Sequence, residues 1–156
     1  MPGTDFDTSR DTCFDTHQVG NQPPVFFPRD LWQDDIALRD AALREGAGAL
    51  VEQVATYGAL AGDALPVLAD EAHRDRPRLR AYDRFGHRID RVEFNPAYHQ
   101  VMDAAISHGV AGLPWAQPQA GAHVARAALS YLHYQVEPGS SCPLTMTHAA
   151  IPVMRR

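Results

Sequence analysis

The sequence contains no lysine, and all 14 of its positively charged side chains are arginines. This absence excludes a lysine Schiff base and a lysine nucleophile. Cysteine is nearly absent too, because Cys13 and Cys142 are the only two and form no CxxC pair. Two distant cysteines, and a polar N-terminus without an apolar signal-peptide core, are typical of a reducing compartment. We therefore predict a cytoplasmic location.

Long apolar runs are also missing, so we predict no membrane partner. The net charge of −5 does not favour a protein that coats nucleic acid or a membrane surface. The chain has 156 residues, of which 45% are hydrophobic and 21% charged. This composition is that of an ordinary globular protein, and the length suffices for one domain with its own core.

Familiar catalytic motifs are absent: the chain has no HExxH, no GxSxG and no glycine-rich phosphate loop. None of the eight histidines has another at the i, i+4 spacing that places two imidazoles on one helical face. His133 and His148 flank one predicted helix junction, but the demanding geometry of metal ligands favours satisfied structural histidines. The apolar neighbours of Cys142 favour an inert buried thiol. We predict no catalytic, cofactor-binding or metal-binding residue in this chain.

Hydrophobic spacing predicts an all-α domain with one small β-hairpin insert. We expect residues 1–15 to be a flexible tail and residues 16–33 an extended arm that ends in aromatic residues and docks on the domain. Residues 34–156 are expected to form the helical domain, with the hairpin at about residues 79–94. The arm could instead reach a neighbouring subunit, but we favour burial of its aromatic residues against the core of its own domain.

Glycine, proline and capping residues mark the expected boundaries within the helical domain. Gly46 and Gly48 interrupt the first helical pattern, which predicts a bend or two short helices. Gly62–Asp63 predicts a helix stop followed by a cap. Asn95–Pro96 predicts the cap and first turn of the next helix. In the first helical pattern, the positions expected to face the core are Ile36, Leu43, Ala47, Leu50, Val54 and Tyr57. In the helical pattern before Pro138, they are Val124, Ala127, Ala128, Tyr131, Leu132 and Val136.

The last predicted helix follows a break at Pro138–Gly139 and is composed almost entirely of small, apolar or threonine residues. A helix that is apolar on all sides belongs in the interior of a larger structure, so we expect its cover to be missing from this chain. Thr145 and Thr147 are its polar groups of interest. They either bond back to the preceding turn or line a cavity shared with another part of the protein.

Seven arginines lie between residues 74 and 91, which permits an anion-binding or nucleic-acid patch. Acidic residues are interleaved with them, and tracks that bind phosphates are rarely neutralised in this way. We therefore interpret this segment as a solvated hairpin with internal ion pairs.

The chain resembles the N-terminal region of AidB-type proteins, a branch of the acyl-CoA dehydrogenase flavoproteins linked to the bacterial adaptive response to DNA alkylation. Five segments show the resemblance in chain order: THQVGNQPP at 16–24, AALREGAG at 41–48, DRFGHRID at 83–90, FNPAYH at 94–99 and VEPGSSCPLTMT at 136–147. The resemblance implies a helical N-terminal domain of the acyl-CoA dehydrogenase fold, followed in the longer protein by a β-domain and a C-terminal helix bundle. The chain would then be truncated before that β-domain.

The resemblance also implies a function for the longer protein. It would be an FAD-dependent oxidoreductase that removes a proton next to the thioester carbonyl of acyl-CoA and passes hydride to the flavin. This domain would shape the acyl pocket and the subunit contacts of a homotetramer, without binding FAD itself. The corresponding helix lines the acyl channel in this family, which implies channel-lining roles for Thr145, Met146, Thr147 and Ala150. The alternative is a DNA-protective module with little turnover, in which DNA binds through the absent C-terminal region rather than through the arginines of residues 74–91.

Overall fold

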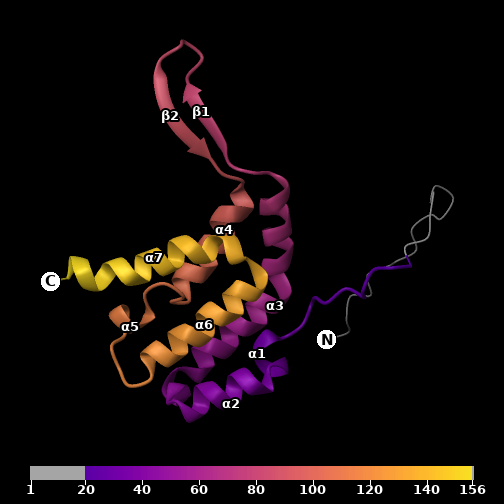
Figure 1. Ribbon diagram of the computed structural model, residues 1–156, viewed down its shortest axis with the longest axis vertical. Helices are drawn as coiled ribbons and strands as arrows, with labels where there is room; N and C mark the ends of the chain where they lie inside the picture. Colours follow the sequence, from indigo (N-terminus) through magenta and orange to yellow (C-terminus); the bar gives the residue numbers. More distant parts are fainter. Residues whose placement is uncertain (1–19, 156) are drawn as a thin grey trace.

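The computed structural model describes residues 20–155, so the predicted tail at 1–15 and the start of the arm lie outside the described residues. The described part is a helical body from which one hairpin projects, which confirms the predicted fold class (Figure 1). Its elements are α1 (Leu31–Asp34), α2 (Ile36–Arg44), the 3-10 helix η2 (Ala47–Leu50), α3 (Val51–Arg74), β1 (Arg78–Tyr82), β2 (Arg88–Glu93), α4 (Pro96–Ser107), α5 (Leu113–Ala116), α6 (Ala122–Val136) and α7 (Pro138–Met154).

Local capping explains the beginning of the helical body. The Asp30 carboxylate accepts hydrogen bonds from the amides of Trp32 and Gln33, so the last residues of the predicted arm form α1 instead of extended chain. The Asp35 carboxylate caps α2 in the same way. Gly46 has a φ of 101°, a left-handed conformation that suits glycine, and it separates α2 from η2. The predicted interruption at Gly46 and Gly48 is therefore confirmed.

Helix α3 runs unbroken for 24 residues, so the predicted stop at Gly62–Asp63 is wrong. Pro66 lies inside this helix and has no amide N–H to bond the carbonyl of Gly62. That carbonyl instead accepts a hydrogen bond from the backbone N–H of Arg29, at 2.8 Å. Contact with a distant segment thus satisfies the group that Pro66 leaves free, and the helix continues through both residues.

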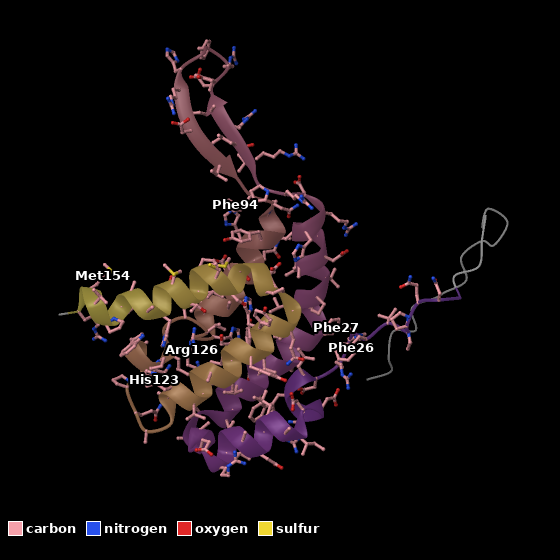
Figure 2. The ribbon with its side chains drawn as sticks, viewed as in Figure 1. Phe26, Phe27, Phe94, His123, Arg126 and Met154 are labelled. Carbon is pink, nitrogen blue, oxygen red and sulfur yellow. The ribbon has the colours of Figure 1, made fainter. Side chains whose placement is uncertain are left out.

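The contact between the N-terminal segment and α3 depends on two glycines one turn apart. A Cβ atom on Gly58 would lie 2.5 Å from the Cβ of Trp32, and one on Gly62 would lie 1.7 Å from the carbonyl oxygen of Arg29. Beside them, Phe27 packs against the core while Phe26 stays exposed under the guanidinium of Arg29 (Figure 2). Residues 27–32 therefore form a strap, the segment that lies across α3.

The hairpin is confirmed and stands away from the helices (Figure 1). Its strands pair antiparallel, with Leu79 opposite Val92 and Arg80 opposite Arg91. Directly opposite residues share a face, so one face carries apolar side chains and the other arginines. The Asp83 carboxylate accepts hydrogen bonds from the amides of Phe85 and His87 and so holds the turn.

The core lies where α3 packs against α1, α4 and α6. Its largest members are Leu31, Trp32, Leu50, Val54, Tyr57, Leu65, Val110, Leu113, Leu129, Leu132 and Leu144. Several predicted core positions are wrong, since Ile36 is 63% exposed, Tyr131 is 51% exposed, and Leu43 and Ala127 are exposed. Helix α6 instead buries Ala122, Ala125, Ala128, Leu129, Leu132 and His133, because its small alanines permit close approach to α3.

The junction between α6 and α7 falls at Glu137, not at the predicted Pro138–Gly139. The Glu137 carboxylate accepts hydrogen bonds from the amides of Gly139 and Ser140 and so caps α7. Pro138 occupies the first turn, where its missing N–H has no helical partner to lose. Within residues 20–155, no helix combines the length and the apolar character required to cross a membrane.

Candidate functional site

A cavity of about 350 Å³ lies between α4, α5 and α7. Helix α4 contributes Met102 and Ile106 to its wall, and α5 contributes Leu113. Helix α7 contributes Leu144, Thr147 and Ile151, which recur at spacings of three and four and so share one helical face. The cavity is thus lined mainly by apolar side chains from elements far apart in sequence.

Most polar groups around this cavity already have partners in the protein backbone. The Gln53 amide donates to the His108 carbonyl at 2.9 Å, and the Ser107 hydroxyl donates to the Ala104 carbonyl at 3.1 Å. The Thr147 hydroxyl donates to the Pro143 carbonyl at 2.9 Å, so this threonine bonds back to the preceding turn and also lines the cavity. Because these donors are engaged, the cavity favours an apolar ligand.

The four predicted channel residues lie on different faces of α7. All four are exposed, and of them only Thr147 lines the cavity. Sequence reasoning missed the other cavity residues of α7, Leu144 and Ile151. The signal for them was present, since Leu144, Thr147 and Ile151 follow the i, i+3, i+7 spacing of a single stripe.

The outer surface of α7 is apolar and uncovered, as its composition predicts. Only Ser140 and Leu144 of this helix are buried. Val153 is 68% exposed, and Met154 at its end (Figure 2) is 84% exposed. Cys142 is also exposed, so the prediction of a buried thiol is wrong: nothing within residues 20–155 covers this thiol.

A buried chain of hydrogen bonds fixes the start of α7 to the body. The Tyr57 hydroxyl lies 2.6 Å from His133 Nδ1, and His133 Nε2 lies 2.7 Å from the Ser140 hydroxyl. The Ser140 hydroxyl can donate in turn to the Glu137 carbonyl, at 3.2 Å. We assign the Nε2–H tautomer to His133, because Tyr57 can then donate to Nδ1 and every proton in the chain has an acceptor.

This chain of bonds is structural rather than nucleophilic. In the assigned tautomer His133 donates to Ser140 and cannot take its proton. Burial lowers the pKa of His133, although the Glu137 carboxylate opposes the shift, and burial raises the pKa of Tyr57. Both groups therefore remain neutral at neutral pH. The Glu137 carboxylate has a partner of its own, because its Oε2 lies 2.9 Å from His73 Nε2. His133 is a satisfied core histidine, as predicted.

His148 has different partners from His133, so the two do not share a site. His148 Nδ1 lies 3.0 Å from the Ala111 carbonyl, which can only accept, so we assign the Nδ1–H tautomer to His148. The Trp115 indole N–H, which lies 3.3 Å from the same Nδ1, then donates to the His148 carbonyl at 3.2 Å. Figure 2 shows His123 at the start of α6, near α5, with Arg126 further along α6. Burial lowers the pKa of His148, and Arg126 and His123 lower it further. Within residues 20–155, no group of three histidine, cysteine or acidic side chains is arranged to hold a metal ion.

Four of the seven arginines between residues 74 and 91 pair with carboxylates. Ion pairs join Arg74 to Asp70, Arg78 to Asp75, Arg80 to Glu93 and Arg88 to Asp90. This result agrees with a solvated hairpin and not with a phosphate track.

The family model for the "Adaptive response protein AidB N-terminal domain" matches residues 21–156. The chain belongs to this AidB family. It is 43% identical over 141 residues to the "Putative acyl-CoA dehydrogenase AidB" of Escherichia coli (strain K12), covering 89% of this chain. The match covers 26% of that relative, so the chain spans about a quarter of its length.

Two solved structures share the fold of this AidB-family chain. One is Caenorhabditis elegans ACDH-11 in complex with C11-CoA, with a TM-score of 0.71 at 21% identity, covering 93% of this chain and 26% of that one. The other is the apo-form of Bd2924, with a TM-score of 0.75 at 22% identity, covering 90% and 28%. At these identities the likeness establishes the acyl-CoA dehydrogenase-like fold of the helical domain.

Proposed function

We propose that this chain is the N-terminal helical domain of an FAD-dependent, acyl-CoA dehydrogenase-like oxidoreductase of the AidB type. In this proposal it shapes the apolar part of the substrate site and contributes subunit contacts. The cavity between α4, α5 and α7 is the observation that carries the proposal. Family membership and the fold shared with ACDH-11, which was solved with C11-CoA, support it.

The cavity suits a straight aliphatic chain. Apolar surfaces of Met102, Ile106, Leu113, Leu144 and Ile151 surround the space, and nearby hydroxyl and amide donors are bonded to carbonyls. A ligand with buried polar groups would find few partners there and would lose their hydration. An acyl tail has no polar groups whose hydration would be lost, and the burial of its apolar surface away from water favours binding.

Thr147 would line the acyl chamber directly. Thr145, Met146 and Ala150 would face the remainder of the longer protein, because they lie on the open sides of α7. The exposed apolar surface that ends in Val153 and Met154 supports contacts with further domains or with other subunits of a homotetramer. Acyl-CoA is the proposed substrate class.

The cavity between α4, α5 and α7 does not fit FAD. The cavity is lined by no arginine or other cation, and its nearby amide and hydroxyl donors are engaged, so it has nothing to bind a pyrophosphate. The proposal therefore assigns the flavin to residues other than these. What this chain would do is bind the acyl tail and keep water away from it.

Decanol tests the cavity, because it is a straight-chain ligand without charge. Calorimetric titration of the 156-residue chain should show saturable binding with a negative heat-capacity change. Ile151→Trp should fill the cavity and abolish binding, whereas Val153→Trp, the same change on the exposed side of α7, should leave binding intact. Circular dichroism checks that both variants fold. Absence of binding to the unaltered chain, or unchanged binding to Ile151→Trp, would refute the proposal.

The alternative, a DNA-protective module with little turnover, is distinguished in the longer protein. Bleaching of the flavin absorbance on addition of an acyl-CoA supports the oxidoreductase. Salt-dependent retention of DNA without bleaching supports the module. The arginine-rich segment gives this alternative little support, because four of its seven arginines pair with carboxylates.

A further inference from the structure

The second half of α7 has few attachments to the rest of the fold. Beyond Leu144, each described residue of the helix is at least partly exposed. His148 supplies the main polar attachment, because its Nδ1 donates to the Ala111 carbonyl and its own carbonyl accepts from the Trp115 indole. Arg155 adds an exposed hydrogen bond to the Trp115 carbonyl at 3.1 Å.

These attachments span the cavity from one wall to the other. Ala111 lines the cavity on the side of α5, while Thr147 and Ile151 line it on the side of α7. His148 follows Thr147 directly and precedes Ile151 by three residues, so the three lie within about one helical turn. The distance between His148 and Ala111 therefore sets how far the two walls stand apart.

We propose that His148 is a positioning residue that holds α7 against the Ala111–Trp115 segment and thereby sets the width of the apolar cavity. This inference rests on the proposed function of the cavity as an acyl-tail site. His148 itself touches no ligand in this arrangement, since its neighbours Thr147 and Ile151, not His148, line the space.

The charges around His148 make its contact sensitive to acid. Helix α6 presents Arg126 and His123 to it, α7 adds Arg155 beyond Trp115, and α5 presents only the indole. Nδ1 carries the proton that bonds Ala111, so acid adds the second proton at Nε2 and creates a cation beside the Arg126 guanidinium. Burial, Arg126 and His123 already lower the pKa of His148 below its ordinary 6.5, although the Ala111 bond opposes the shift. Protonation keeps the Nδ1–H donor, but it places a cation in a part-buried site beside Arg126, so the docked position of α7 loses stability as the pH falls below that value.

Amide hydrogen exchange tests the contact without any ligand. His148→Phe keeps a ring but loses the donor to Ala111, and the freed end of α7 should fray because short isolated helices are marginal. Protection of the amides of residues 149–151, 153 and 154 should fall roughly fivefold, the effect of about one hydrogen bond. His148→Asn places an amide N–H near the position of Nδ1, so it should restore protection and remove its dependence on acid. His87→Asn in the hairpin turn is the matched control and should change neither.

Decanol binding then tests whether the contact sets the width of the cavity. His148→Phe should weaken binding roughly fivefold at neutral pH, and His148→Asn should bind as the unaltered chain does but without weakening in acid. If exchange in α7 is the same in His148→Phe and the unaltered chain, or if His148→Phe binds decanol normally at every pH, the positioning role is refuted. If exchange responds as expected while the unaltered chain binds no decanol, the acyl-tail function fails and the contact between His148 and Ala111 stands.

Discussion

Replacing Gly62 by alanine tests how the strap of residues 27–32 stabilises the fold. The added Cβ would lie 1.7 Å from the carbonyl oxygen of Arg29, far inside any permitted contact, and the nearest atoms are backbone that cannot rotate away. The strap must therefore move off α3. Its movement breaks the 2.8 Å hydrogen bond from the Arg29 amide to the Gly62 carbonyl, which Pro66 cannot replace.

The expected cost follows from opposing contributions. An unsatisfied buried carbonyl costs about 1–3 kcal/mol. Leu31 and Trp32 are both buried in the native fold and would become partly exposed. Full burial of one large side chain contributes about 1.5–3 kcal/mol, so partial exposure of these two adds roughly 2 kcal/mol to the cost. Alanine regains about 0.5–1 kcal/mol over glycine through its helix propensity. Gly62→Ala should therefore lower the free energy of unfolding by about 2–4 kcal/mol and the Tm by roughly 5–15 °C.

The matched control is Gly48→Ala, because a Cβ there meets nothing within 4 Å. It should leave the Tm unchanged or raise it slightly. Urea denaturation followed by far-UV circular dichroism measures both variants. If Gly62→Ala is as stable as Gly48→Ala, the strap does not contact α3 as described and the explanation of the unbroken helix at Pro66 is wrong.

Three further predictions concern the junction of α6 and α7. Because burial lowers the pKa of His133 below its ordinary 6.5, the unfolded chain binds the proton more tightly, so stability should be full above that pH and fall below it. The Tm of His133→Gln, measured above and below that pH, should decline less steeply in acid than the Tm of the unaltered chain. An equally steep decline in both would show that other groups cause the pH dependence. Ser140→Ala removes the acceptor of the His133 Nε2–H and should cost about 1–3 kcal/mol, whereas Ser141→Ala, with a weaker 3.4 Å bond, should cost far less. Equal urea midpoints would show that the buried bond between His133 and Ser140 does not stabilise the junction. Glu137→Ala removes the cap of α7 and should cost about 1–2 kcal/mol in the same assay, and a neutral result would show that the cap is dispensable.

The amino-acid sequence by itself determined features that depend on a few neighbouring residues. Asn95 and Pro96 begin α4, and the Asn95 side chain accepts from the Ala97 amide at 2.7 Å. Gly46 separates α2 from η2, and the hairpin forms where aromatic and β-branched residues flank a glycine turn. The composition of the last helix also indicated its open surface. In each case the deciding interaction lies within one turn or one strand pair, so the pattern of residues contains it.

Tertiary structure alone decided features that depend on distant partners. Gly62 and Pro66 remain helical because the Arg29 amide, more than thirty residues earlier in the chain, satisfies the free carbonyl. Which face of α6 is buried depends on where α3 lies, so Tyr131 is exposed while His133 is enclosed with Tyr57. The cavity likewise needs α4, α5 and α7 together, because no one of them encloses a volume. A helical pattern gives only relative directions around an axis, and packing against other elements determines which of them faces the interior.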